Sequence, residues 1–165
     1  MFHGLTIREY IKEHINHDTE YWQFGTGADY ILSYLLQYSE KDWAWLSNEI
    51  LNWRAEEIEI LAASLAHIKQ FPDDTDGIIR PRFKLFSQIF GNLEAAQAYD
   101  LLDDLLEFLE INKPELEKDS LQRIQIQLDN IKELFIKDNQ SQWLSEIQDK
   151  INSRIKNKSS TKYIA

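Results

Sequence analysis

Five carboxylates are spaced so that they would share one face of an α-helix. Counted from the first, they stand at offsets of 0, 3, 4, 7 and 10 residues, and an α-helix turns once about every 3.6 residues. No lysine or arginine lies between them to offset their repulsion, which costs roughly 0.2–0.5 kcal/mol per like-charged pair in an isolated helix. Since a cationic partner would relieve this repulsion, the pattern predicts either a solvated face or a surface for a basic partner. The five are Asp100, Asp103, Asp104, Glu107 and Glu110.

Two further carboxylates, Asp74 and Asp76, lie in the segment Phe71–Gly77, whose proline, aspartates and glycine predict a loop. If its glycine takes the sixth position of a calcium-binding loop, the two aspartates take the third and fifth positions. The first position would then be Pro72 and the twelfth Phe83, and neither can supply a carboxylate. The spacing therefore excludes an EF-hand, and we expect a solvated loop or an acidic contact loop that adds to the surface for a basic partner.

His14 and His17 are close enough along a helix to approach one metal ion from the same side. A zinc site also needs a third ligand and supporting hydrogen bonds, and only Asp18 is nearby in the sequence. We therefore expect His14 on an apolar face and His17 in solvent, with no metal ion and no cofactor bound. Because the serines lack a connecting histidine–carboxylate pattern, no catalytic residue is predicted. A metal-dependent helical enzyme built on the two histidines is the third hypothesis.

The elements that hold these residues are predicted to be entirely α-helical. The chain contains no valine, much leucine and isoleucine, and only 5 glycines and 3 prolines among 165 residues. Apolar residues recur at spacings of three and four, which predicts seven or eight helices in one domain of residues 1–157, followed by a frayed polar and basic tail of residues 158–165. A bundle and a HEAT-like stack of helix pairs are both compatible with this pattern. The predicted helices are Thr6–His17, Asp29–Tyr38, Trp43–Trp53 capped by Asp42, Ala55–Gln70, Arg80–Phe90, Leu93–Ile111, Pro114–Asp138 and a last one from Trp143 to Ile155.

Two other groups of residues in these helices have a structural explanation beside a functional one. Glu56, Glu57 and Glu59 open a predicted helix, where carboxylates interact favourably with the helix dipole. Tyrosines recur every four residues at Tyr30, Tyr34 and Tyr38. We expect this row at the edge of the core. The second functional hypothesis is a helical scaffold that self-associates through it, and the sequence leaves the oligomeric state open.

The charge of the chain bears on which partners it can have. The net charge of −10 divides into −6 for residues 1–70, −7 for residues 71–120 and +3 for residues 121–165. The acidic part would repel nucleic acid and anionic membranes and attract basic proteins. There is no cysteine, and the sequence from Met1 to Glu13 shows no secretory signal. With no apolar run near the ~20 residues of a membrane span, these features favour a cytoplasmic protein with a protein partner.

A longer pattern covers residues 40–112. It comprises Trp43-x-x-Leu46, Ile50-x-x-Trp53 and Glu57-x-x-x-Leu61-Ala62-x-x-Leu65, then the Asp-rich loop, Arg80–Phe86 and the acidic segment Asp100–Glu110. This stretch resembles small all-α immunity proteins of bacterial toxin systems, in particular those of contact-dependent growth inhibition. The resemblance implies a cytoplasmic, non-enzymatic protein that binds one cognate toxin domain and blocks it. Because many such toxins are basic nucleases, an acidic inhibitor is electrostatically complementary to them. The favoured function is therefore an immunity protein that neutralises a basic toxin domain through its acidic surface.

Overall fold

A computed structural model describes residues 3–23, 25–66, 75–110 and 116–164 of the chain. Within these ranges every regular element is helical and no strand occurs, which confirms the all-α prediction. The elements are α1 (His3–Glu13), α2 (Thr19–Gln23), α3 (Thr26–Leu35), α4 (Glu40–Glu49) with a 3-10 turn (Ile50–Asn52), α5 (Ala55–Leu65), α6 (Thr75–Asn92), α7 (Ala95–Asp100), α8 (Leu102–Leu109), α9 (Lys118–Asn130), α10 (Lys132–Lys137) and α11 (Ser141–Ile164).

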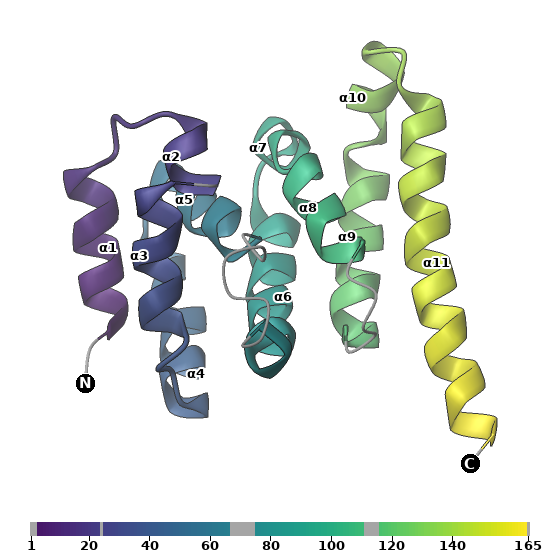
Figure 1. Cartoon of the computed structure of the whole chain (residues 1–165). Helices are drawn as coiled ribbons and strands as arrows, with labels where there is room; N and C mark the ends of the chain where they lie inside the picture. Colours follow the sequence, from purple (N-terminus) through teal and green to yellow (C-terminus); the bar gives the residue numbers. More distant parts are fainter. Residues whose placement is uncertain (1–2, 24, 67–74, 111–115, 165) are drawn as a thin grey trace.

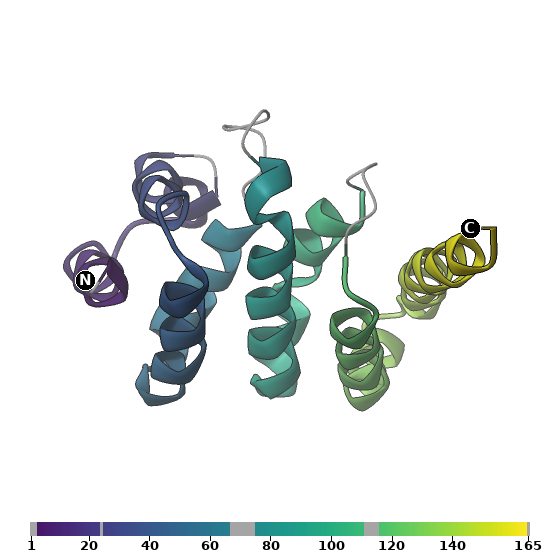
Figure 2. The ribbon, with the colours of Figure 1, turned by 90° about the horizontal axis from the view of Figure 1, so that it is seen from below.

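The chain crosses the molecule from α1 at one end, through α6, to α11 at the other end (Figure 1). Viewed from below, they follow an arc with α6 near its middle and the two termini at opposite ends (Figure 2). The most extensive helix contacts are those of α6 with α9 and with α5, and α11 packs on α9 and α10. None of the described helices is both long and apolar enough to cross a bilayer.

The start of α4 differs from the predicted cap at Asp42. Ser39 is the N-cap, and its Oγ accepts a hydrogen bond from the Asp42 backbone N–H at 3.3 Å. The Asp42 carboxylate accepts the Ser39 backbone N–H at 2.9 Å in return. This reciprocal pair is a capping box, which satisfies two N–H groups that have no partner within the helix. The sequence contains Ser39 three residues before an acidic residue, so the correct cap could have been identified.

Helix α6 is longer than predicted because neither of its helix-breaking residues ends it. Pro81 lies inside the helix, and Gly91 is its penultimate residue. A Cβ on Gly91 would come within 3.0 Å of the Arg123 Cγ on α9. The glycine thus allows α6 and α9 to approach closely, whereas the predicted helix ended one residue before it, at Phe90.

Two helices predicted as continuous are each divided into two. The acidic segment breaks at Leu101, between α7 and α8, and the following helix breaks at Ile131, between α9 and α10. At both positions the backbone leaves the helical region, with φ near −100° and ψ near 8°. Leu101 and Leu102 are both buried, at 4% and 1% exposure.

The core is continuous through the domain and contains one fully buried arginine. Phe83, Phe86 and Phe108 pack against one another in it. Arg82 is 0% exposed, lies over the Phe108 ring, and its Nε donates to the Leu65 carbonyl at 2.8 Å. Leu65 is the last residue of α5, so the guanidinium satisfies a carbonyl that has no partner inside its helix. Burial lowers the pKa of Arg82 to about 9.

The C-terminal helix is the last difference from the predicted elements. The backbone of α11 is helical as far as Ile164, where the sequence predicted a frayed tail of residues 158–165. Its apolar residues Leu144, Ile147 and Ile151 are buried, as their spacing predicts.

Candidate acidic binding site

The acidic segment does not form the single continuous face that its spacing predicts. Because the helix breaks at Leu101, Asp100 ends α7 while the other four carboxylates belong to α8 or its end. Asp100, Asp103 and Glu110 are exposed, Glu107 is half-buried and Asp104 is 5% exposed. Asp74 lies outside the described residues. Asp76 lies in the first turn of α6, where only the backbone is described.

A groove collects two of these carboxylates with two others from α5. Its volume is about 430 Å³, and it is formed by α5, by α2 with the residues before it, and by the α7–α8 junction. We call it the acidic groove, defined by the carboxylates of Glu56, Glu59, Asp100 and Asp104. Apolar side chains form the rest of its wall, among them Ile60, Ala63 and Leu101.

Helix α2 is held against α5 by contacts that place its side chains along the groove. The Ser64 hydroxyl donates to the Trp22 carbonyl at 3.1 Å. Gly27, at the start of α3, faces Trp22 and Tyr21 so closely that a Cβ there would come within 2.7 Å of both rings. Gln23 reaches across from α2, and its Nε2 donates to the Asp104 Oδ1 at 3.0 Å. The Ser64 hydrogen bond thus joins α5 to α2, and the Gln23 hydrogen bond joins α2 to α8 across the groove.

Asp104 is the most perturbed carboxylate of the site. Its pKa is raised to about 7, chiefly by burial and to a lesser extent by the charges of Asp103 and Glu107, while the Gln23 hydrogen bond acts in the opposite direction. Its second carboxylate oxygen has no hydrogen-bond partner in the described part of the chain. Above pH 7 the group is therefore a buried anion held by one neutral donor, which is an unfavourable state without a cation nearby.

Glu59 shows the same effect more weakly. Burial raises its pKa, and the charges of Asp100 and Glu56 raise it further. These shifts show that carboxylates from α5 and from the α7–α8 junction interact across the groove. No lysine or arginine among the described residues forms an ion pair with Glu59, Asp100 or Asp104. The Arg54 Nη2 lies 3.9 Å from a carboxylate oxygen of Glu56, but both side chains are exposed to solvent. The potential at the other three carboxylates of the groove is therefore negative.

The other end of the acidic segment is neutralised within the molecule. The Lys150 Nζ on α11 lies 3.6 Å from a Glu110 carboxylate oxygen. The Arg154 Nη2 donates to the carbonyl of Leu109, the last residue of α8. Two cations thus meet the C-terminal end of a helix dipole, where positive charge is favourable. Part of the basic C-terminal segment therefore has a structural role.

The glutamates at the start of α5 have different environments, although the sequence suggested one shared role with the helix dipole. Glu57 is fully buried and accepts the Arg8 Nε at 2.8 Å, which attaches α1 to α5. Glu56 is exposed and Glu59 half-buried, and both line the acidic groove. Their spacing of three residues places Glu56 and Glu59 on one helix face, which is the only signal in the sequence for this wall.

The two histidines belong to an aromatic stack. The His14 ring stacks on Tyr10 at 4.2 Å, and the His17 ring stacks on Tyr21 at 3.9 Å. Tyr10 and Tyr21 share a short hydrogen bond through their hydroxyls, and Tyr30 stacks on the other side of Tyr10 at 3.8 Å. No group of three or more histidine, aspartate or glutamate side chains in the described ranges could hold a metal ion.

The tyrosine row is half-buried along its length. Tyr34 and Tyr38 pack against the core, and Tyr30 stacks on Tyr10 within the chain. These contacts agree with the expected position at the edge of the core.

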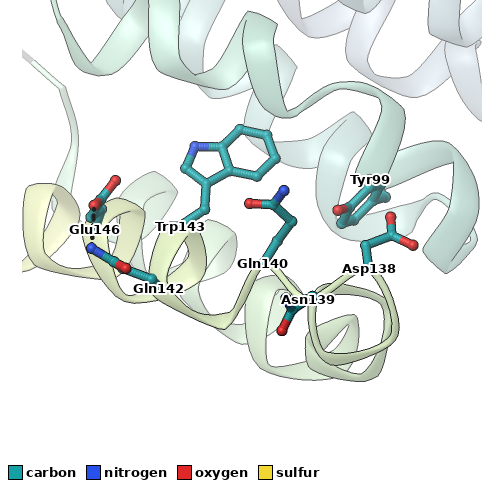
Figure 3. Close-up of a pocket in the computed structure, with 7 residues that line it drawn as sticks. All are labelled: Tyr99, Asp138, Asn139, Gln140, Gln142, Trp143 and Glu146. Atoms are coloured by element: carbon teal, nitrogen blue, oxygen red, sulfur yellow. Dashed lines mark hydrogen bonds between the residues drawn. The ribbon is translucent and has the colours of Figure 1, made fainter.

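A second hollow of about 580 Å³ lies where α10 turns into α11 (Figure 3). Tyr99, Gln140 and Trp143 face it from α7, the turn and α11. Its carboxylates, Asp138 and Glu146, are both exposed to solvent. Because neither carries the desolvation of Asp104, the acidic groove is the stronger candidate site. Comparisons of the chain with protein-family models, with curated proteins and with solved structures gave no match.

Proposed function

We propose that this protein is a cytoplasmic immunity-type inhibitor that neutralises a basic toxin domain by binding it at the acidic groove. The observation that carries the proposal is Asp104, a buried carboxylate with a pKa near 7 and one neutral hydrogen-bond donor. A basic surface docked over Glu59, Asp100 and Asp104 would supply the missing positive charge. The net charge of −10 would also speed the encounter with such a partner, to an extent that falls with salt.

The groove suits a binding role better than a catalytic one. General acid–base catalysis needs a group beside a reacting atom, and nucleophilic catalysis needs a base hydrogen-bonded to the nucleophile. The neighbours of Asp104 are a glutamine amide, other carboxylates and apolar side chains. This arrangement can bind a positively charged group, which agrees with what the resemblance to immunity proteins implies.

The test is capture from lysate of the source cells, compared between two double variants of equal charge. Glu59→Gln with Asp104→Asn removes two charges from the groove, while Asp129→Asn with Glu133→Gln removes two from α9 and α10. We expect the native chain and the second variant to retain one basic protein at low salt, and the groove variant to lose it. Removing one member of a desolvated charge pair costs about 2–5 kcal/mol in affinity.

The captured protein is then expressed alone and together with this chain in a heterologous host. The proposal expects growth arrest by the partner alone and normal growth with the native chain present. Equal capture by both variants would remove the groove as the binding site. Toxicity that this chain does not relieve would overturn the assignment as an inhibitor.

A further inference from the structure

A further groove, larger than the acidic groove, lies between α4 and α6. Its volume is about 790 Å³, within the range of small-ligand pockets, about 300–1,000 Å³. Among the described residues, none that lines it also lines the acidic groove. We call it the α4–α6 groove, and its two walls are residues 40–48 of α4 and residues 78–88 of α6. At a rise of 1.5 Å per residue these walls are about 12 and 15 Å long, which is the length of about four residues of extended polypeptide.

The two ends of the α4–α6 groove differ in chemistry. At one end the Gln88 Nε2 donates to the Ser47 carbonyl at 2.9 Å, and the Ser47 hydroxyl donates to the Gln88 Oε1 in return. Asn48 is exposed beside this pair, and its side chain makes no hydrogen bond in the described part of the chain. An amide side chain can both donate to and accept from a peptide backbone. At the other end Tyr38 and Trp43 are half-buried and pack edge to face, with ring centroids 5.2 Å apart.

The α6 wall is a positive stretch in an acidic chain. From residue 78 to residue 92 the helix contains three basic residues and no carboxylate. One of the three is the buried Arg82, whereas Arg80 and Lys84 are exposed and line the groove one helical turn apart. Like charges at this spacing repel each other. Lys84 forms no ion pair with any described carboxylate.

The two carboxylates of the groove have a structural explanation that Lys84 lacks. Glu40 lies in the first turn of α4, and Glu117 is the N-cap of α9, so each lies at the positive end of a helix dipole. Lys84 lies in the middle of α6, where the dipole gives no such benefit. A carboxylate from another molecule would pair with Lys84 and relieve its repulsion with Arg80.

We propose that the α4–α6 groove binds an extended, acidic segment of a partner polypeptide, about four residues long. An acidic side chain of this segment lies at Lys84, and its backbone amide groups hydrogen-bond to Asn48. An apolar side chain packs on Tyr38 and Trp43 at the other end. The inference goes beyond the proposed function and does not depend on it, because the ligand has the opposite charge and the groove is a separate one.

The test uses the full ¹⁵N-labelled chain and two blocked tetrapeptides, acetyl-Ala-Glu-Leu-Ala-amide and the same peptide with glutamine in place of glutamate. The signals followed are the Trp43 indole N–H and the Asn48 side-chain amide. We expect the glutamate peptide to shift both signals saturably at millimolar concentration, and the glutamine peptide to bind at least tenfold more weakly. Acetyl-Glu-amide carries the same charge but is too short to follow the groove, and it should also bind at least tenfold more weakly than the tetrapeptide.

Three variants separate Lys84 from the other exposed cations. Lys84→Gln should weaken binding of the glutamate peptide at least tenfold, Lys84→Arg should restore most of it, and Lys132→Gln on α10 should leave it unchanged. Equal binding of the two tetrapeptides, unmoved Trp43 and Asn48 signals, or unchanged affinity in Lys84→Gln would overturn the inference. Tighter binding of ATP than of the glutamate peptide at the same signals would overturn the assignment to a polypeptide. Capture of a basic protein through the acidic groove is measured separately, so failure of either experiment leaves the other conclusion in place.

Discussion

Replacing Asp104 by asparagine should stabilise the protein at high pH and lose that advantage as the pH falls. The pKa of this carboxyl rises from 3.8 to about 7 on folding. At roughly 1.4 kcal/mol per pKa unit, a difference of about three corresponds to about 4 kcal/mol. Between pH 4 and 7 the folded state binds more protons at Asp104 than the unfolded state does. The contribution of this group to stability is therefore complete below pH 4 and is lost as the pH rises through about 7.

Asparagine has nearly the same shape and can still accept the Gln23 hydrogen bond, but its own amide N–H groups need acceptors. An unpaired buried polar group costs about 1–3 kcal/mol, so the net gain of Asp104→Asn at pH 8 should be about 2 kcal/mol. The effect of the charge alone is the change with pH in the difference in unfolding free energy between Asp104→Asn and the native protein. This change should be about 4 kcal/mol between pH 4 and 8. Urea unfolding at pH 4, 6 and 8 measures it.

Asp103 is the matched control because it precedes Asp104 on α8 and is exposed. Asp103→Asn should change the free energy of unfolding by about 0.5 kcal/mol or less at each pH. If the native protein and Asp104→Asn show parallel stability across this pH range, Asp104 is not a buried anion at pH 8. The electrostatic argument for the groove would then fail with it.

Three further substitutions test the contacts that hold the groove in place. Arg82→Lys keeps the charge but not the planar fork that holds the Leu65 carbonyl, and should lower the free energy of unfolding by about 2 kcal/mol in chemical denaturation. Arg8→Ala leaves Glu57 buried without its ion pair, and should lower the free energy of unfolding by about 3 kcal/mol. It should also speed amide hydrogen exchange in α1. Unchanged exchange would contradict the attachment of α1 to α5 by this ion pair. Arg154→Ala removes a charged hydrogen bond from the end of α8 and should lower the melting temperature by an amount equivalent to about 1 kcal/mol, while Lys158→Ala in the tail serves as its control.

The helical class and most of the core followed from periodicity. On α9, Leu121, Ile124 and Leu128 are all buried, because residues spaced three and four apart lie on one face of a helix. Such local patterns need no knowledge of the neighbouring helices. The break at Leu101 was not predicted, because no proline or glycine marks it in the sequence.

The groove itself could be predicted only in part. The sequence predicted that Asp100 and Asp104 bind a partner. The structure places both in one groove, and partner binding there stays a proposal. The contributions of Trp22, Gln23 and Glu59 come from two other helices, and no local pattern in the sequence connects them with the acidic segment. Contacts that join residues 81 positions apart, such as Gln23 with Asp104, depend on tertiary packing alone.

The two ends of the acidic segment differ: described cations meet the Glu110 end, whereas none forms an ion pair with Asp100 or Asp104. The chain carries cations close enough to neutralise part of this surface, and it uses Lys150 and Arg154 at the end of α8. The exposed pair of Lys150 with Glu110 adds little to stability, since both side chains are about half in solvent or more. Asp104 is the carboxylate for which a cation would matter most, because it is buried, yet no described lysine or arginine pairs with it. A charge placed where it weakens the fold is explained by a contact that exists only in a complex, and this reasoning supports the proposal that the groove binds a partner.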